Sequence, residues 1–124
     1  MEKVYIVGAK RTAIGSFQGS LASVSAAELG TVVVNAVLAE AGMHPEAVDE
    51  VIFGNALPAG QGQGVARQIS IQAGLPDSIP ASGINMVCGS GLKSVMNGFA
   101  SIKAGLNNVV LTGGVESMSQ APHL

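Results

Sequence analysis

The stretch Asn85-Met86-Val87-Cys88-Gly89-Ser90-Gly91-Leu92 contains the only cysteine of this 124-residue sequence. The run 82–87 that leads into Cys88 is typical of a strand. The residues that follow have apolar side chains at spacings of three and four, which is the pattern of a helix. Cys88 is therefore predicted at a strand-to-helix turn. The first N–H groups of a helix are unpaired and its dipole is positive there, and both favour the reactive thiolate.

The small residues Gly89, Ser90 and Gly91 allow a substrate or another backbone to come close to this turn. This pattern favours a nucleophilic role for Cys88. A second interpretation stays open at this point, because free cysteine is among the most buried residue types and usually only packs. Spacing alone does not decide between the two roles.

The composition limits the classes of function. Hydrophobic residues make up 48% of the sequence and charged residues only 11%, so much of the surface is expected to meet other protein. A net charge of −2 and the lack of a basic run argue against nucleic-acid binding. One cysteine excludes an internal disulfide and fits a reducing, cytoplasmic location. We expect no targeting segment, no membrane span and no metal site.

The chain alternates between predicted strands and helices in the order β-α-β-α-β-α-β. Such crossovers are typical of a parallel sheet in an α/β fold. Ser25 and Glu28 form a capping box at the start of the first helix, and Gly42 is expected to end it. The helix from about residue 90 to 104 is apolar nearly all round, which predicts a buried helix. The expected strands are Val4–Gly8, Val51–Gly54, Ser82–Val87 and Val109–Gly114.

The glycine- and glutamine-rich loop 55–64 follows the second predicted strand. Ligands gather beyond the carboxyl ends of strands in open α/β sheets, so this loop is a candidate ligand site. A phosphate cradle is disfavoured because the loop lacks the Gly-Lys-Ser/Thr ending of a P-loop. A plain connector is the simpler interpretation.

Several motifs together resemble the thiolase family, and within it the enzymes with acetyl-CoA acetyltransferase activity. The resemblance covers the whole chain. The motifs are Arg11-Thr12-Ala13-Ile14-Gly15-Ser16-Phe17, Gly54-Asn55, Gln63-Gly64-Val65-Ala66-Arg67-Gln68, Asn85-Met86-Val87-Cys88-Gly89-Ser90-Gly91 and Gly113-Gly114-Val115-Glu116-Ser117-Met118-Ser119.

The resemblance implies an acyl transfer in which Cys88 takes an acetyl group from acetyl-CoA as a thioester. A second acetyl-CoA then attacks this thioester and gives acetoacetyl-CoA, a Claisen condensation whose reverse is thiolysis. Coenzyme A thioesters would be substrates, and no cofactor would be bound permanently. The residues near the catalytic loop, through backbone or packing, would be Gly89, Ser90, Gly91, Gly113 and Gly114.

The resemblance also implies a fold and an assembly. The fold would be a three-layer α-β-α half with a mostly parallel sheet of order 3-2-1-4. Residues 82–87 would lie at the sheet edge against a symmetry mate in a homodimer or homotetramer. The interface candidates are Gln63, Arg67 and Asn85.

Thiolases are several times longer than this chain, and their second cysteine and their oxyanion-hole histidine and asparagine lie far downstream. Residues 1–124 are therefore expected to be the amino-terminal part of a thiolase N-terminal domain. The loop domain and the C-terminal domain would be absent, and the chain alone would be inactive. Two alternatives remain: another condensing enzyme of the superfamily, or a non-catalytic flavodoxin-like binding module with a buried Cys88.

Overall fold

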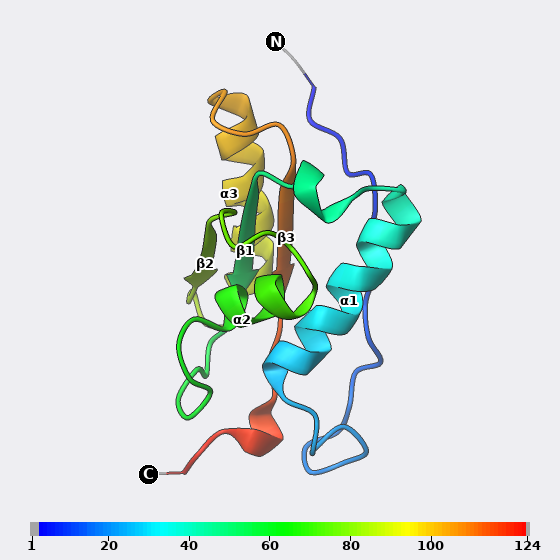
Figure 1. Ribbon diagram of the computed structural model, residues 1–124. Helices are drawn as coiled ribbons and strands as arrows, with labels where there is room; N and C mark the ends of the chain where they lie inside the picture. Colours follow the sequence, from blue (N-terminus) through cyan, green and yellow to red (C-terminus); the bar gives the residue numbers. More distant parts are fainter. Residues whose placement is uncertain (1–2, 124) are drawn as a thin grey trace.

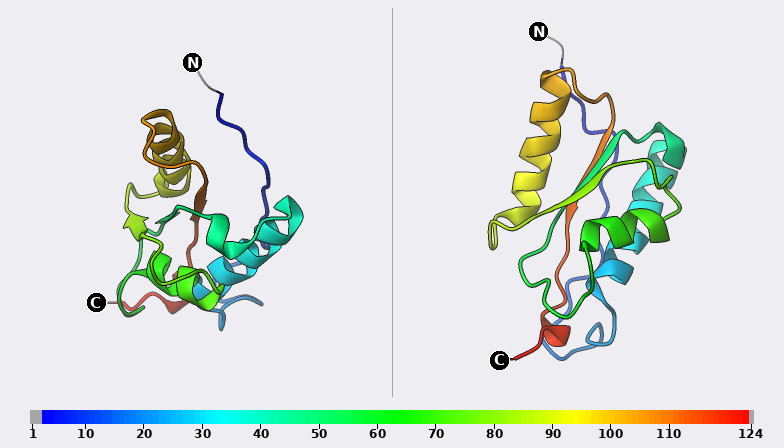
Figure 2. Two further views of the ribbon diagram at one scale, coloured as in Figure 1. Left: turned by 45° about the horizontal axis from the view of Figure 1, so that its top comes forward. Right: turned by 60° about the vertical axis from the view of Figure 1, so that its left-hand side comes forward.

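The computed structural model describes residues 3–123 and has three layers, with a parallel sheet between helices (Figure 1). Helices α1 and α2 cover one face of the sheet and α3 covers the other (Figure 2). The predicted fold class is confirmed. The strands are β1 Glu50–Gly54, β2 Ala81–Ile84 and β3 Val110–Gly114; the helices are α1 Ala26–Ala41, α2 Val65–Gln72 and α3 Ser90–Lys103, with 3₁₀ turns η1 Pro45–Ala47 and η2 Met118–Gln120.

The first helix begins and ends where its local sequence predicts. Ser25 Oγ accepts the Glu28 N–H, and the Glu28 carboxylate accepts the Ser25 N–H, which completes the capping box. Gly42 ends α1 in the left-handed conformation with φ of 61°. No helix among residues 3–123 is long and apolar enough to cross a membrane.

The sheet order is β2-β1-β3, and both pairings are parallel. β1 is central, with Val51 opposite Ala81 of β2 and Leu111 of β3. β2 therefore lies at an edge, as predicted for the third strand of the sequence. Its outer edge carries backbone N–H and C=O groups that need a partner or solvent.

The predicted position of the run Val4–Gly8 is wrong. The order 3-2-1-4 places this run between the second and fourth predicted strands, but these two strands, β1 and β3, pair directly. Since β2 takes the other edge of β1, no edge of the central strand is left for this run. Tyr5 and Ile6 are 73% and 81% exposed. The apolar pattern of this run indicated a buried strand. A local pattern does not show which edge of the central strand is free for pairing.

The amino-terminal segment instead runs alongside α1 (Figure 1). The Ala9 N–H donates to Glu40 on α1 at 3.1 Å, and Lys10 forms an ion pair with the same carboxylate at 3.2 Å. An apolar groove of about 1040 Å³ lies between this segment, α1, α3 and β3. The groove separates the segment from β3.

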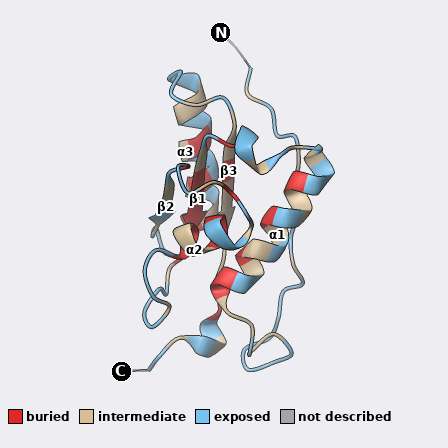
Figure 3. Ribbon diagram, viewed as in Figure 1, coloured by how far each residue is buried: buried red, intermediate tan, exposed pale blue. Residues whose placement is uncertain are grey.

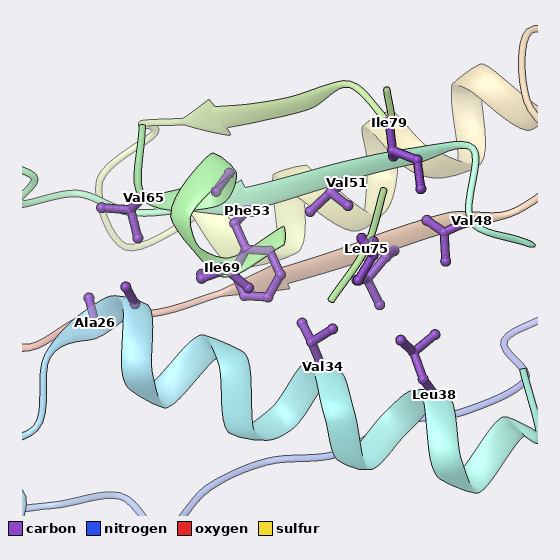
Figure 4. Packing of buried hydrophobic residues seen from close by; sticks show 13 residues of the cluster. Ala26, Val34, Leu38, Val48, Val51, Phe53, Val65, Ile69, Leu75 and Ile79 are labelled. Carbon is purple, nitrogen blue, oxygen red and sulfur yellow. The ribbon is translucent and has the colours of Figure 1, made fainter. Parts of the chain in front are cut away.

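The hydrophobic core lies between the sheet and the pair α1–α2 (Figure 4). Phe53 and Val51 project from the central strand toward Val34 of α1 and Ile69 of α2, and all four are at most 2% exposed. Burial of side chains of this size stabilises the fold by about 1.5–3 kcal/mol each. The core therefore fixes β1, and with it the loops that follow the strands.

The expected burial of α3 holds for only one of its faces within residues 3–123. Its sheet-facing residues are small, namely Ser90, Ser94 and Gly98, and these are the ones that are buried. Its large apolar side chains are exposed, including Leu92 at 70% and Phe99 at 51%. Figure 3 colours the ribbon by the burial of each residue. An all-round apolar pattern indicates that something covers each face, and within residues 3–123 only one face is covered.

Asp49 ties the amino ends of β1 and β3 together. Its carboxylate accepts the N–H groups of Asn108 at 2.8 Å and Val109 at 2.9 Å. These hydrogen bonds favour the charged form and lower the pKa of Asp49 below its usual value.

We expect Asp49→Asn to lower the free energy of unfolding at neutral pH by about 0.5–1 kcal/mol, a small value because the carboxylate is exposed. A lowered pKa stabilises the fold above the unfolded-state pKa of about 3.9 and loses that effect as the pH falls through the folded-state pKa. Urea unfolding of both proteins at neutral pH and at a pH below the folded-state pKa measures this difference in the free energy of unfolding. An equal deficit in acid and at neutral pH would contradict the role of the charge.

Candidate functional site

Cys88 lies in a tight turn between β2 and α3. The strand ends at Ile84, three residues before the end of the predicted run 82–87. Two backbone bonds close the turn: Gly89 N–H to Met86 O at 3.0 Å, and Ser90 N–H to Val87 O at 3.2 Å. The Cys88 thiol is exposed. This contradicts the buried cysteine of the binding-module alternative.

The turn has an unusual backbone conformation at Val87, with φ of 50°. A β-branched residue rarely adopts a positive φ, because its side chain crowds the backbone there. Asn85 supports this conformation, since its Oδ1 accepts the Val87 N–H at 3.1 Å. The backbone before Cys88 is therefore held by a specific side chain.

The start of α3 is packed directly on the ends of β1 and β3. A Cβ at Gly54 would lie 2.7 Å from the Gly91 nitrogen, and one at Gly114 would lie 2.8 Å from the Gly91 Cα. Such contacts do not occur in real structures without a backbone shift. These glycines are what allow the cysteine turn to lie at the carboxyl edge of the sheet.

Glu116, which follows β3, joins the loops at this edge. Its carboxylate accepts the N–H groups of Ala56 at 2.8 Å and Leu57 at 2.9 Å, and the amide of Asn55 at 3.0 Å. Asn85 in turn donates to Ala56 O at 3.1 Å. The loops after all three strands are thereby connected by hydrogen bonds, and Asn85 extends the connection to the cysteine turn.

The sequence analysis assigned no role to Glu116. A signal was present, since the residue is a carboxylate at the carboxyl end of a buried strand, opposite a glycine-rich loop with free N–H groups. The long-range partners, about 60 positions away in the chain, could not be read from local sequence.

The structure brings most of the predicted site residues together. Gly89 is the N-cap of α3, Ser90 is its first residue, and Gly91 contacts Gly114. Asn85 supports the same turn. Gly113 differs, because its Cα faces the Phe53 ring on the core side of the sheet.

The other two predicted interface residues lie before and within α2. Gln63 is in the loop before α2, and its backbone carbonyl accepts a bond from Gln68 at 2.9 Å. Arg67 is on α2, and its Nη1 is buried without a hydrogen-bond partner among the described residues. No group of three or more potential metal ligands occurs within residues 3–123.

This geometry can support nucleophilic chemistry. The thiol is exposed, lies at the amino end of a 14-residue helix, and is held by a turn fixed to three strands. The positive end of the helix dipole lies at this end of α3. The site is therefore suited to a thiolate that attacks an electrophilic carbon.

Comparisons with known proteins find relatives along the whole length of the chain. Residues 4–124 match the model of the thiolase N-terminal domain. An acetyl-CoA acetyltransferase of Cupriavidus necator is 56% identical over 124 residues, which is all of this chain and 32% of that protein. A cytosolic acetyl-CoA acetyltransferase of Mus musculus is 52% identical over 99% of this chain and 31% of its own length.

A solved structure is also similar. A thiolase from Ascaris suum, determined in complex with coenzyme A, superposes with a TM-score of 0.94 at 43% identity, over 95% of this chain and 31% of that one. The chain thus spans about a third of the length of the relatives that it matches.

We expect Glu116→Gln to destabilise the loops at the carboxyl edge, because an amide group would then face backbone N–H donors. The free energy of unfolding should fall by about 1–3 kcal/mol, and the Ala56 and Leu57 amides should exchange faster with solvent. The matched control is Glu46→Gln on the exposed η1 turn, which should change stability by less than about 0.5 kcal/mol. Equal effects of the two substitutions would contradict the role of Glu116.

Proposed function

Because the chain belongs to the thiolase family, we propose that the protein that carries it joins two molecules of acetyl-CoA into acetoacetyl-CoA and coenzyme A, and catalyses the reverse thiolysis. The observation that carries this proposal is the exposed Cys88 thiol in a hydrogen-bonded turn at the amino end of α3. The names of the Cupriavidus and mouse relatives support acetyl-CoA as the acyl donor.

Cys88 is the nucleophile in this proposal. Its thiolate attacks the carbonyl carbon of acetyl-CoA, the bond from that carbon to the coenzyme A sulfur breaks, and an acetyl thioester forms on Cys88. A second acetyl-CoA loses a methyl proton to a base, and its carbanion attacks the enzyme thioester. The new C–C bond forms as the Cys88 thiolate leaves. Splitting the reaction in this way replaces one difficult step by two easier ones.

The residues around Cys88 position it rather than react. Gly54 and Gly114 let the start of α3 lie against the strand ends. Asn85 and Glu116 hold the loops at this edge. In an acyl transfer this arrangement keeps the sulfur fixed relative to the bound thioester, which lowers the entropic part of the barrier.

The proposal assigns residues 1–124 to the amino-terminal part of the thiolase N-terminal domain, with the loop domain and the C-terminal domain provided by sequence outside this chain. The oxyanion donors and the group that handles the methyl proton belong to those parts. Losing even one oxyanion donor typically costs about 10²–10³-fold in rate, so residues 1–124 alone should be inactive. The exposed apolar face of α3 is where a second, similar half would pack.

The remaining parts of the proposal concern ligands, assembly and location. Coenzyme A thioesters are substrates, with no permanently bound cofactor, in keeping with the coenzyme A complex of the Ascaris thiolase. The edge strand β2 pairs with its symmetry mate in a homodimer or homotetramer, with Gln63, Arg67 and Asn85 near the interface. A free, exposed thiol and the cytosolic mouse relative support a cytoplasmic location.

We expect Cys88→Ser in the intact protein to lower the kcat of acetoacetyl-CoA thiolysis by at least about 10³-fold, because the hydroxyl is a far weaker nucleophile than the thiolate. The thermal midpoint and circular dichroism should match those of the wild type, since the side chain is exposed. Thiolysis at a near-normal rate by a fully folded Cys88→Ser protein would exclude Cys88 as the nucleophile.

The dimer proposal has its own test. We expect Ser82→Lys on β2 to convert the dimer to a monomer in light-scattering measurements, because a lysine on a sheet edge opposes strand pairing. Asn35→Lys on the exposed face of α1 is the matched control and should leave the mass unchanged. A Ser82→Lys protein with the wild-type mass would place the interface elsewhere.

A further inference from the structure

We propose that Ser90 is a positioning residue for Cys88, whose hydroxyl fixes the turn that presents the thiol. The catalytic part of this inference rests on the proposed function. The geometry of the turn, from which the inference is argued, does not depend on which reaction the protein catalyses.

The Ser90 hydroxyl makes two short hydrogen bonds across the turn. Its Oγ accepts the Met86 N–H at 2.7 Å and donates to the Val87 carbonyl at 2.6 Å. The side chain is only 4% exposed, so water does not compete for these bonds. A single buried hydroxyl thus connects the first turn of α3 to the two residues that precede Cys88.

These bonds act where the backbone is least favourable. Val87 has φ of 50°, a conformation that a β-branched residue adopts only when its surroundings hold it. Asn85 holds the N–H of Val87 and Ser90 holds its carbonyl, so both polar groups of this residue are fixed by side chains. Without the Ser90 hydroxyl, the Val87 carbonyl keeps only its bond from the Ser90 backbone N–H at 3.2 Å. The Val87–Cys88 peptide, and with it the Cys88 sulfur, is then held less firmly.

Ser90 itself is held by a rigid part of the fold. A Cβ at Gly54 would lie 2.7 Å from the Ser90 Cβ, so the serine is packed against the end of the central strand. The hydroxyl therefore links the cysteine turn to β1, whose position is fixed by the core. Supporting groups on rigid elements are what keep a reactive atom within the narrow range that catalysis needs.

Ser94, one turn further along α3, provides a matched comparison. It is fully buried, and its hydroxyl contacts the carbonyls of Gly91 at 2.6 Å and Gly113 at 2.8 Å. It is a buried serine on the same helix as Ser90, but one of its contacts lies within α3, the other joins α3 to β3, and neither involves residues 86–88. Ser90→Ala and Ser94→Ala should therefore destabilise the fold to a similar extent and differ only in their effect on Cys88.

The test compares these two variants in the intact protein by three measurements: thermal unfolding, amide exchange at Met86, and the rate of Cys88 alkylation by iodoacetamide. We expect Ser90→Ala to increase Met86 amide exchange and to slow alkylation, each by about 10-fold, because two buried bonds are lost and the turn no longer holds the thiol in its exposed position. Ser94→Ala should leave both rates within about twofold of the wild type at a similar thermal midpoint.

Equal alkylation and exchange rates in the two variants would overturn the proposal, and so would an unchanged Met86 exchange rate in Ser90→Ala. Acetylation by acetyl-CoA is measured separately on the same samples. If wild-type Cys88 is alkylated but not acetylated, the proposed function is wrong. The alkylation rates of the two serine variants still test the positioning role in that case. If acetylation slows in Ser90→Ala in parallel with alkylation, both are supported.

Discussion

The direct contact between the first turn of α3 and the ends of β1 and β3 is the constraint on which the rest of the site depends. Gly54 and Gly114 provide it, because a side chain at either position would collide with the first turn of α3. The contact sets where α3 begins, and Cys88 lies two residues before that point. A larger residue at Gly54 or Gly114 would move the helix start and the nucleophile together.

Side-chain hydrogen bonds complete what the close packing begins. Glu116 binds the loop after β1 and Asn85 links that loop to the cysteine turn. These groups come from the ends of all three strands, so the turn is held from several directions. The hydrophobic core under β1 stabilises the same strand on which this arrangement rests. Core packing thus fixes the strand ends, and the strand ends fix the turn that carries the thiol.

Features determined by nearby residues could be predicted from the sequence. The Ser25–Glu28 capping box and the Gly42 helix end are local interactions, and both occur as expected. The turn at Cys88 was found because a strand pattern changes to a helix pattern there. Features determined by distant residues could not be predicted. The run Val4–Gly8 has the apolar pattern of a buried strand, yet β1 and β3 pair without it. Glu116 was not assigned a role because its partners lie on another loop.

The low charge content and the outward-facing apolar side chains of α3 have a common explanation in the proposed domain organisation. Only 11% of residues are charged, and Leu92 and Phe99 are more than half exposed within residues 3–123. Relatives about three times as long have further sequence that can cover such a face. The sheet-facing side of α3 carries small residues because the strand ends lie so close, which leaves its large residues to pack elsewhere.

The central claim is that Cys88 carries the acyl group, and peptide mapping by mass spectrometry tests it most directly. The intact protein is mixed with acetyl-CoA, quenched in acid to preserve thioesters, digested and analysed. The account predicts one acetyl group on the peptide that contains Cys88, removed by hydroxylamine or by added coenzyme A. An acetyl group on a different residue, or an unmodified Cys88 in a protein that cleaves acetoacetyl-CoA, would contradict it.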